Sequence, residues 1–285
     1  LGSKYEFFHE WKRLSEQETG SVALETMLRG ICKKENFLDL LENFILFDHS
    51  GGRTAKILAR NHQYLGVNEA VKAYEARKLN NGKLGVFWHT QGSGKSYSMV
   101  FLAQKIRRKF AGSPTIVILT DRDELNKQIS DTFENCGLLG KTKASQFIAT
   151  SGEDLVQKLK GNPSFIFTLI QKFNKANPEP IYPDHDILIM SDEAHRSQYG
   201  IFADNMTALL PTASRIGFTG TPLLSNDNIT ERTFGGYISV YDFKRAVEDG
   251  ATVPLYYENR GDKIADLHNP EITDRILDAI ERADL

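Results

Sequence analysis

Short apolar, β-branched runs alternate with longer helical stretches from Lys83 onward. That rhythm is typical of an α/β domain, in which helices flank a mostly parallel sheet. We predict five strands, at residues 84–88, 115–119, 165–170, 187–190 and 215–218. A chain with this pattern is strongly constrained, because parallel strands must be joined by crossover connections that cover the faces of the sheet.

Each predicted strand is followed by a polar cluster. In open α/β sheets the ligand site lies beyond the carboxyl ends of the strands. We therefore expect the five clusters to converge on one edge of the sheet. They begin at His89, Thr120, Gln171, Ser191 and Thr219.

The cluster after the first strand has the features of a phosphate-binding loop. Its glycines allow backbone N–H groups to surround phosphate oxygens, and a helix, predicted at residues 97–108, follows directly. In such a loop Lys95 reaches the β- and γ-phosphates of ATP, and the Ser96 hydroxyl ligates Mg²⁺. His89 stands where the usual pattern has its leading glycine, and an ordinary glycine-rich turn is the alternative interpretation. The loop itself reads Gly92-Ser93-Gly94-Lys95-Ser96.

Two acids follow the fourth predicted strand, in the sequence Asp192-Glu193-Ala194-His195. Asp192 is suited to hold Mg²⁺, and Glu193 to orient and deprotonate the attacking water. Charged residues at a strand end are often only solvated, but the phosphate-binding loop upstream favours the catalytic interpretation.

Composition excludes several other classes of protein. The net charge of -2 argues against a protein that coats nucleic acid by bulk charge. Cys32 and Cys136 show no spacing of a zinc site or disulfide framework, which favours a reducing, cytoplasmic setting. No apolar run of about 18 residues exists, so we expect no membrane span. The start, Leu1-Gly2-Ser3-Lys4, has no initiator Met and no signal-peptide core, so we expect a piece of a longer chain.

The order of these motifs resembles motifs I, Ia, II and III of superfamily 2 helicases and translocases. Their extended forms look like those of the restriction (R) subunit of type I restriction-modification enzymes, and the likeness covers residues 37–260. The segments that carry it are Trp88-His89-Thr90-Gln91-Gly92-Ser93-Gly94-Lys95-Ser96, Thr120-Asp121-Arg122-Asp123-Glu124-Leu125, Asp192-Glu193-Ala194-His195-Arg196-Ser197-Gln198-Tyr199-Gly200 and Gly217-Phe218-Thr219-Gly220-Thr221-Pro222.

The resemblance implies a RecA-like P-loop NTPase domain, the first of two motor lobes. Residues 49–260 would form this lobe, and the helical pattern of residues 1–48 would be a connector to an absent nuclease domain. Residues 261–285 would be a helical exit toward an absent second lobe. The parent protein would be a bacterial or archaeal ATP-dependent translocase of double-stranded DNA that works with methylase and specificity subunits and supports DNA cleavage.

The resemblance also implies roles for individual residues. Arg60 and Gln63 would read adenine, and Thr90 and Gln91 would join the phosphate-binding loop in holding the nucleotide. Thr219, Gly220 and Thr221 would couple hydrolysis to lobe movement. DNA phosphates would be contacted by Thr120, Arg122, Thr168, Gln171 and Lys172. The alternatives are a helix-surface Gln63, a plain tight turn at Thr219 and solvated surface cations.

The catalytic activity of the chain on its own is expected to be limited. Glu10-Trp11-Lys12 matches half of a nuclease motif, but no Asp precedes it, so we expect no nuclease here. Without the second lobe and its arginine finger, the chain should bind ATP far better than it hydrolyses it. An RNA helicase of the Asp-Glu-Ala-His type and a non-catalytic ATP-sensing module remain the alternative functions.

Overall fold

A computed structural model describes residues 8–192, 199–222 and 228–253. The chain divides into two compact units, Leu1–Thr252 and Val253–Leu285. The expected connector, residues 1–48, falls inside the first unit. The expected exit segment, residues 261–285, lies outside the described residues.

The centre of the first unit is a six-stranded sheet in the order β5-β4-β6-β7-β3-β8. Every pairing in it is parallel. The five predicted strands are confirmed, and their carboxyl ends therefore lie at one edge. The bounds are β3 Lys83–His89, β4 Thr115–Thr120, β5 Phe165–Leu169, β6 Ile187–Asp192, β7 Ser214–Thr219 and β8 Tyr237–Tyr241.

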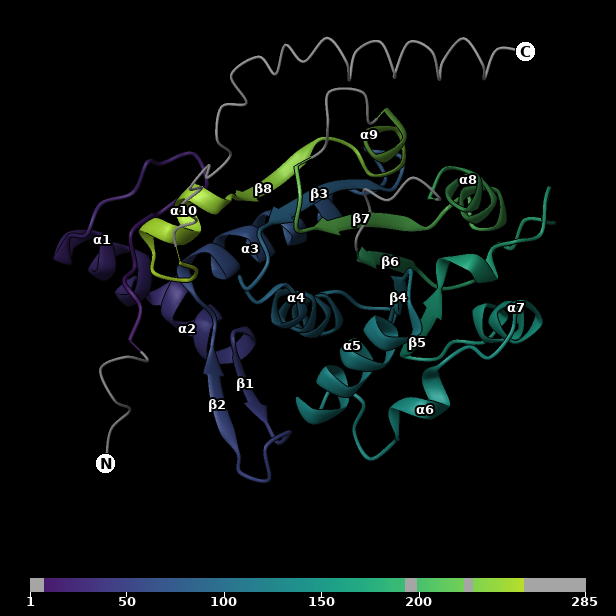
Figure 1. The fold of residues 1–285 in the computed structure, drawn as a ribbon, viewed down its shortest axis with the longest axis horizontal. Coiled ribbons are helices and arrows are strands. Elements are labelled where there is room, and N and C mark those ends of the chain that lie inside the picture. Colours follow the sequence, from purple (N-terminus) through teal and green to yellow (C-terminus); the bar gives the residue numbers. More distant parts are fainter. Residues whose placement is uncertain (1–7, 193–198, 223–227, 254–285) are drawn as a thin grey trace, which may run out of the picture. The chain divides into compact units, whose positions relative to one another are not determined.

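Burial explains why these segments form strands. Every residue of β4, β6 and β7 is buried, as expected for parallel strands that are covered on both faces. One face packs Phe87, Ile118, Phe167 and Met190 against α3, α4 and α5. The other face packs Val117 and the alternate residues of its neighbours against α7 and α8. Figure 1 shows the two groups of helices on opposite sides of the sheet.

The helices that surround the sheet vary in length. Those that position the candidate site are α3 and α4, which contain 15 residues each. The helical segments are α1 Leu24–Met27, a π-helical turn Leu28–Cys32, α2 Lys34–Asn43, α3 Asn61–Glu75, α4 Lys95–Lys109, α5 Asp123–Asn135, α6 Ala144–Phe147, α7 Gly152–Lys160, a 3-10 turn Ile170–Lys172, α8 Tyr199–Leu209, α9 Asn228–Phe234 and α10 Phe243–Glu248.

The helical prediction for the N-terminal segment is only partly correct. Residues 8–22 form no helix, because Trp11 and Arg13 are buried against the lobe and anchor an irregular path there. Ile45–Asp48 forms strand β1, which pairs antiparallel with β2, Ala55–Leu58. Burial along β1 alternates, which fits the two-residue period of a strand and not the period of a helix.

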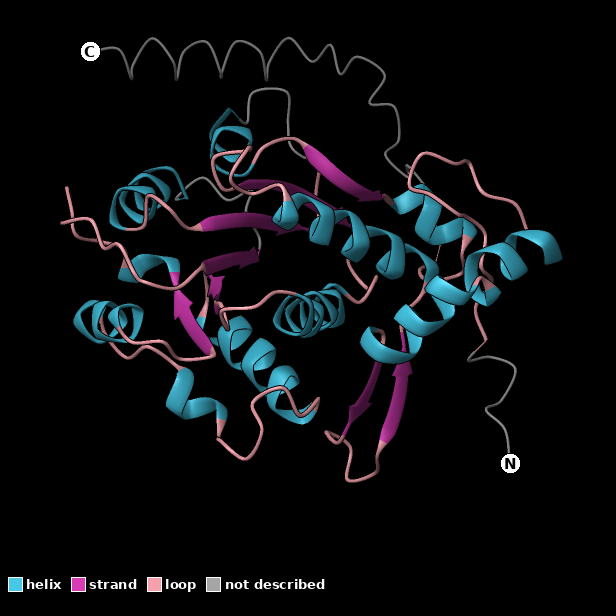
Figure 2. Ribbon diagram, turned by 180° about the vertical axis from the view of Figure 1, so that it is seen from behind, coloured by secondary structure: helices cyan, strands magenta, loops and turns pink. Residues whose placement is uncertain are grey.

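The β1–β2 hairpin extends away from the six-stranded sheet, as Figure 2 shows from behind. Its turn contains the polar segment His49-Ser50-Gly51-Gly52-Arg53. None of the helices in the described part of the chain is long and apolar enough to cross a membrane.

Candidate nucleotide-binding site

The loop between β3 and α4 depends on its glycines. Gly92 has φ of 78° and Gly94 has φ of 84°, both in the left-handed region that L side chains rarely adopt. A Cβ on Gly94 would also approach Gln63 Nε2 to 2.7 Å, whereas a Cβ on Gly92 would meet open space. The strand, loop and helix predicted for a phosphate-binding loop are thus present in that order.

Lys95 and Ser96 are the first two residues of α4, where the helix N-terminus favours anions. Lys95 Nζ donates to the carbonyl oxygen of His89 at 3.0 Å. The buried hydroxyl of Ser93 has no hydrogen-bond partner among the described residues. The loop therefore presents a cation and a free buried hydroxyl at the start of a 15-residue helix.

Strand β7 lies between β3, which leads into the phosphate-binding loop, and β6, which ends at Asp192. In the register Trp88 faces Thr219, while Asp192 faces Phe218. A Cβ on Gly220 would lie 3.1 Å from Lys95 Nζ, so the turn after β7 touches the loop. Asp192 is only 8% exposed. The structure thus brings the ends of β3, β7 and β6 together, while Glu193 lies outside the described residues.

The start of α3 is tied to the same loop. Gln63 Nε2 donates to Gly94 O at 3.0 Å, and Gln63 Oε1 accepts from Arg60 N at 2.9 Å. Both halves of this amide are therefore engaged by backbone groups, in a side chain that is 4% exposed. Arg60 lines a cavity of about 170 Å³ together with His62 and Tyr241. Adenine recognition by Arg60 and Gln63 stays a prediction.

His62 was not singled out by the sequence, yet it contacts the loop directly. Its Nε2 lies 3.0 Å from Ser93 O, and its ring stacks on Tyr241 with centroids 3.7 Å apart. Burial lowers the pKa of His62 to about 4, so the ring is neutral near pH 7. A neutral imidazole has one N–H donor, which His62 directs to the Ser93 carbonyl.

The turn after β7 uses the hydroxyl that was predicted to couple hydrolysis to movement. Thr219 Oγ1 donates to Thr221 O at 3.0 Å and accepts from Thr221 N at 3.2 Å. These bonds close a tight turn, as the alternative interpretation expects. A coupling role for Thr219, Gly220 and Thr221 stays a prediction.

The predicted DNA-contacting residues differ in their surroundings. Thr120 and Thr168 are buried, because they lie within β4 and β5 under the flanking helices. Arg122 is exposed, with its Nε 3.8 Å from Asp121 Oδ2. Lys172 Nζ donates to the carbonyl of Ala149, which is part of the protein itself.

Gln171 lies between these DNA-contacting segments. Its Nε2 donates to Asp121 O at 2.8 Å, so the segments after β5 and β4 are joined. A DNA role for any of the five residues stays a prediction, and Arg122 is the cation with the greater freedom to contact a ligand.

Strand β8 and the residues attached to it were missed. No strand was predicted after residue 218. A β-branched and aromatic run, Tyr237-Ile238-Ser239-Val240-Tyr241, is the signal that could have revealed the strand. Ser239 on this strand bonds His89 Nε2 at 2.7 Å.

The parallel sheet, the phosphate-binding loop at a helix N-terminus and the acid two strands away define a RecA-like P-loop ATPase lobe. The chain belongs to the SWI2/SNF2 ATPase family, whose pattern matches residues 62–284. Nucleotide use by this domain follows from that membership.

Curated relatives agree with the resemblance to type I R subunits, which is confirmed. The HindI endonuclease subunit of Haemophilus influenzae is 39% identical over 91% of this chain. The SsaAORF53P endonuclease subunit of Staphylococcus saprophyticus is 30% identical over 64% of the chain. The chain spans only 27% and 20% of the lengths of these two type I restriction enzyme subunits.

Two solved structures support the fold. A nuclease-deletion mutant of the Type ISP restriction-modification enzyme LlaGI, in complex with a DNA substrate mimic, superimposes with a TM-score of 0.51 and 19% identity. The superposition covers 68% of this chain and 20% of the LlaGI chain. The UvsW helicase of bacteriophage T4 also has a TM-score of 0.51 and 19% identity, with coverage of 72% and 67%.

Proposed function

We propose that this chain is the ATP-binding motor lobe of a type I restriction enzyme R subunit. In the longer protein it drives ATP-dependent translocation of double-stranded DNA and supports DNA cleavage. The observation that carries the proposal is the position of β7, which is hydrogen-bonded to β3 on one side and to β6 on the other. The phosphate-binding loop after β3 and Asp192 at the end of β6 therefore lie at the same edge of the sheet.

The chemistry of the side chains fits a magnesium–ATP complex. Mg²⁺ prefers hard oxygen ligands and keeps several waters, so one hydroxyl and one carboxylate suffice as protein ligands. Ser96 and Asp192 are that pair, and no group of three or more His, Cys, Asp or Glu side chains that could hold a metal occurs in the described residues. Bound Mg²⁺ neutralises charge on the phosphates. Lys95 binds the β- and γ-phosphates, and Glu193 positions and deprotonates the attacking water.

The nucleotide base is placed by the start of α3. Phosphates held at Gly92, Ser93 and Gly94 put the sugar and base near His62, because His62 reaches the loop carbonyl at Ser93. Arg60 and Gln63 then lie beside adenine, with Thr90 and Gln91 closing the loop. Gln63 reads the base edge only if it exchanges one of its present backbone bonds.

The proposed partners are double-stranded DNA and the methylase and specificity subunits of a type I complex. Support comes from the relatives, which are named as type I restriction enzyme endonuclease subunits. The DNA track runs over the ends of β4 and β5, where Arg122 is exposed and Gln171 joins the two loops. Contacts of this kind hold the phosphate backbone and carry no sequence information.

Nucleic-acid-stimulated ATP hydrolysis by the longer protein tests the proposal. We expect duplex DNA to stimulate hydrolysis without strand separation, and single-stranded RNA of equal length to leave it at the basal rate. Stimulation by RNA with unwinding would instead support an RNA helicase. If neither duplex DNA nor RNA stimulates ATP hydrolysis while ATP binding is intact, the result would support an ATP-sensing module.

Replacing Arg122 with alanine is expected to weaken duplex DNA binding uniformly across sequences. Loss of one phosphate contact should reduce the slope of log K against log salt by about 1. Lys172→Ala should change the slope less, because Ala149 already accepts from this ammonium. Salt-dependent fluorescence anisotropy on two unrelated duplexes provides the measurement. Equal slopes for wild type and Arg122→Ala would remove Arg122 from the DNA track.

A further inference from the structure

An irregular segment, residues 9–20, which we call the strap, lies against the start of α3 and contacts β8 through Glu16. Asn61 holds the strap by accepting from Arg13 N at 2.9 Å and donating to Arg13 O at 3.0 Å. Lys12 Nζ donates to Asp249 Oδ1 at 2.8 Å, which fastens the same segment to the end of α10. The strap is therefore attached both to the start of α3 and to the end of α10.

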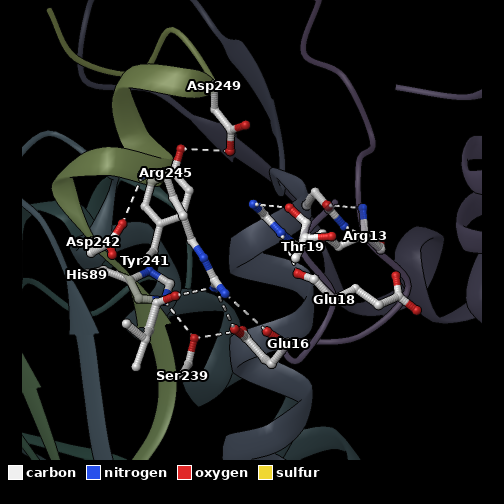
Figure 3. Close-up of polar contacts among 12 residues, drawn as sticks. Arg13, Glu16, Glu18, Thr19, His89, Ser239, Tyr241, Asp242, Arg245 and Asp249 are labelled. Carbon is white, nitrogen blue, oxygen red and sulfur yellow. Dashed lines mark hydrogen bonds and ion pairs between the residues drawn. The ribbon is translucent and has the colours of Figure 1, made fainter. Parts of the chain in front are cut away.

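Arg13 shapes the strap into a turn that presents Glu16. Its Nε donates to Glu18 O and its Nη2 to Thr19 O, each at 3.0 Å. Leu14 N donates to Glu18 Oε2 at 2.7 Å, which closes the turn from the other side. Arg13 itself is only 5% exposed. Glu16, at the tip of this turn, points toward β8 (Figure 3).

Glu16 connects to the phosphate-binding loop through two further side chains. Ser239 Oγ donates to Glu16 Oε1 at 2.7 Å, and Ser239 Oγ lies 2.7 Å from His89 Nε2. His89 is fully buried, and its carbonyl oxygen accepts from Lys95 Nζ. Figure 3 shows Glu16, Ser239 and His89 in sequence, with Arg245 beside the carboxylate. Arg245 Nη1 lies 3.7 Å from Glu16 Oε2.

Glu16, Ser239 and His89 form a chain of two hydrogen bonds, which we call the relay. The protons available on the three side chains determine which group donates in each bond. Burial raises the pKa of Glu16, whereas the hydrogen bond from Ser239 and the charge of Arg245 favour the ionised carboxylate. An ionised Glu16 only accepts hydrogen bonds, so Ser239 must donate its single proton to it. The Ser239 oxygen then accepts from His89, which places the His89 proton on Nε2. Burial lowers the pKa of His89 well below its usual value, so the ring carries only that one proton. Its Nδ1 has no hydrogen-bond partner among the described residues, as expected for a lone pair.

We propose that Glu16 and Ser239 are positioning residues for ATP binding, which act through His89 to orient the carbonyl that holds Lys95. The inference rests on the proposed function, since it concerns the same phosphate-binding loop. It adds that the strap, a segment outside the sequence motifs, sets the geometry of that loop. A shift of the strap would reorient the ring of His89, and through its backbone the resting position of Lys95.

Equilibrium titration of the 285-residue chain with fluorescent Mg²⁺–ATP tests the relay. Ser239→Ala and Glu16→Ala are each expected to raise the Kd about 5- to 10-fold, the effect of one buried hydrogen bond. The double variant should lie within about twofold of either single variant, because one relay is broken in all three. Glu18→Gln is the matched control: it lies on the same turn, keeps an acceptor for Leu14 N and should leave the Kd unchanged.

A second measurement, on the wild-type chain and on Ser239→Ala, reads the tautomer of His89. Two-bond ¹H–¹⁵N spectra should show the proton on Nε2 in wild type, and a mixture with Nδ1–H in Ser239→Ala. The spectra test the direction of the hydrogen bonds, and the Kd tests their effect on ATP binding. An Nδ1–H ring in wild type, or a Kd within twofold of wild type for folded Ser239→Ala, would overturn the inference.

Lys95→Ala distinguishes failure of the relay from failure of the ATP site. If Lys95→Ala loses ATP while Ser239→Ala does not, the relay fails and the ATP site stands. If Lys95→Ala binds ATP as wild type does, the proposed function itself fails.

Discussion

Replacing Lys95 with alanine is expected to raise the Kd for Mg²⁺–ATP about 100-fold. Removal of one partner from a desolvated charge pair costs about 2–5 kcal/mol, and tenfold in Kd corresponds to about 1.4 kcal/mol. In the structure Lys95 Nζ donates to the backbone carbonyl oxygen of His89 at 3.0 Å. Isothermal titration calorimetry of the chain with Mg²⁺–ATP gives the comparison.

Lys109→Ala is the matched control for this variant. Lys109 is the last residue of the same helix, and its ammonium forms a surface ion pair with Glu75 at 3.3 Å. Exposed pairs of this kind contribute about 0–1 kcal/mol, so ATP affinity should stay within about twofold of wild type. Equal affinity of wild type and Lys95→Ala would remove the phosphate-binding assignment.

Glu193→Gln is expected to reduce ATP turnover by the longer protein about 10²- to 10⁴-fold, the usual contribution of a general base. The amide is nearly isosteric with the carboxylate but cannot take the proton of the attacking water. ATP affinity should change by less than about threefold, since binding depends on the loop, Ser96 and Asp192. Turnover is followed as phosphate release with saturating duplex DNA.

The control for Glu193→Gln is Glu179→Gln, which removes an exposed carboxylate from the loop before β6. That variant should turn over ATP at the wild-type rate. Unchanged turnover in Glu193→Gln would contradict the catalytic role and favour the ATP-sensing alternative.

The fold of the nucleotide-binding edge could be predicted because its signals are local. Fully buried parallel strands read as continuous apolar runs, and β4, β6 and β7 are buried at every position. The loop at residues 92–96 combines glycines, a cation and a hydroxyl within one short segment. That combination of neighbouring residues is enough to indicate phosphate binding.

The missed elements have weaker local signals. Strand β8 is an edge strand that contains a polar Ser239 and an exposed Tyr237, so no uninterrupted apolar run marks it. The relay joins Glu16 and Ser239, which are 223 positions apart in the chain. No pattern in the sequence reveals a hydrogen bond of that span. The N-terminal segment misled the prediction because Trp11 is buried against the lobe on an irregular path and not on a helix.

The shared backbone ladder of β3, β7 and β6 has a mechanical consequence. Neighbouring strands lie about 4.8 Å apart, so the tips of β3 and β6 are held roughly 10 Å from each other by main-chain bonds alone. Side-chain substitutions inside β7 can loosen the core without altering that span. Any movement that nucleotide binding causes in this lobe is therefore expected in the turns beyond the strands, because the hydrogen-bonded strands resist separation.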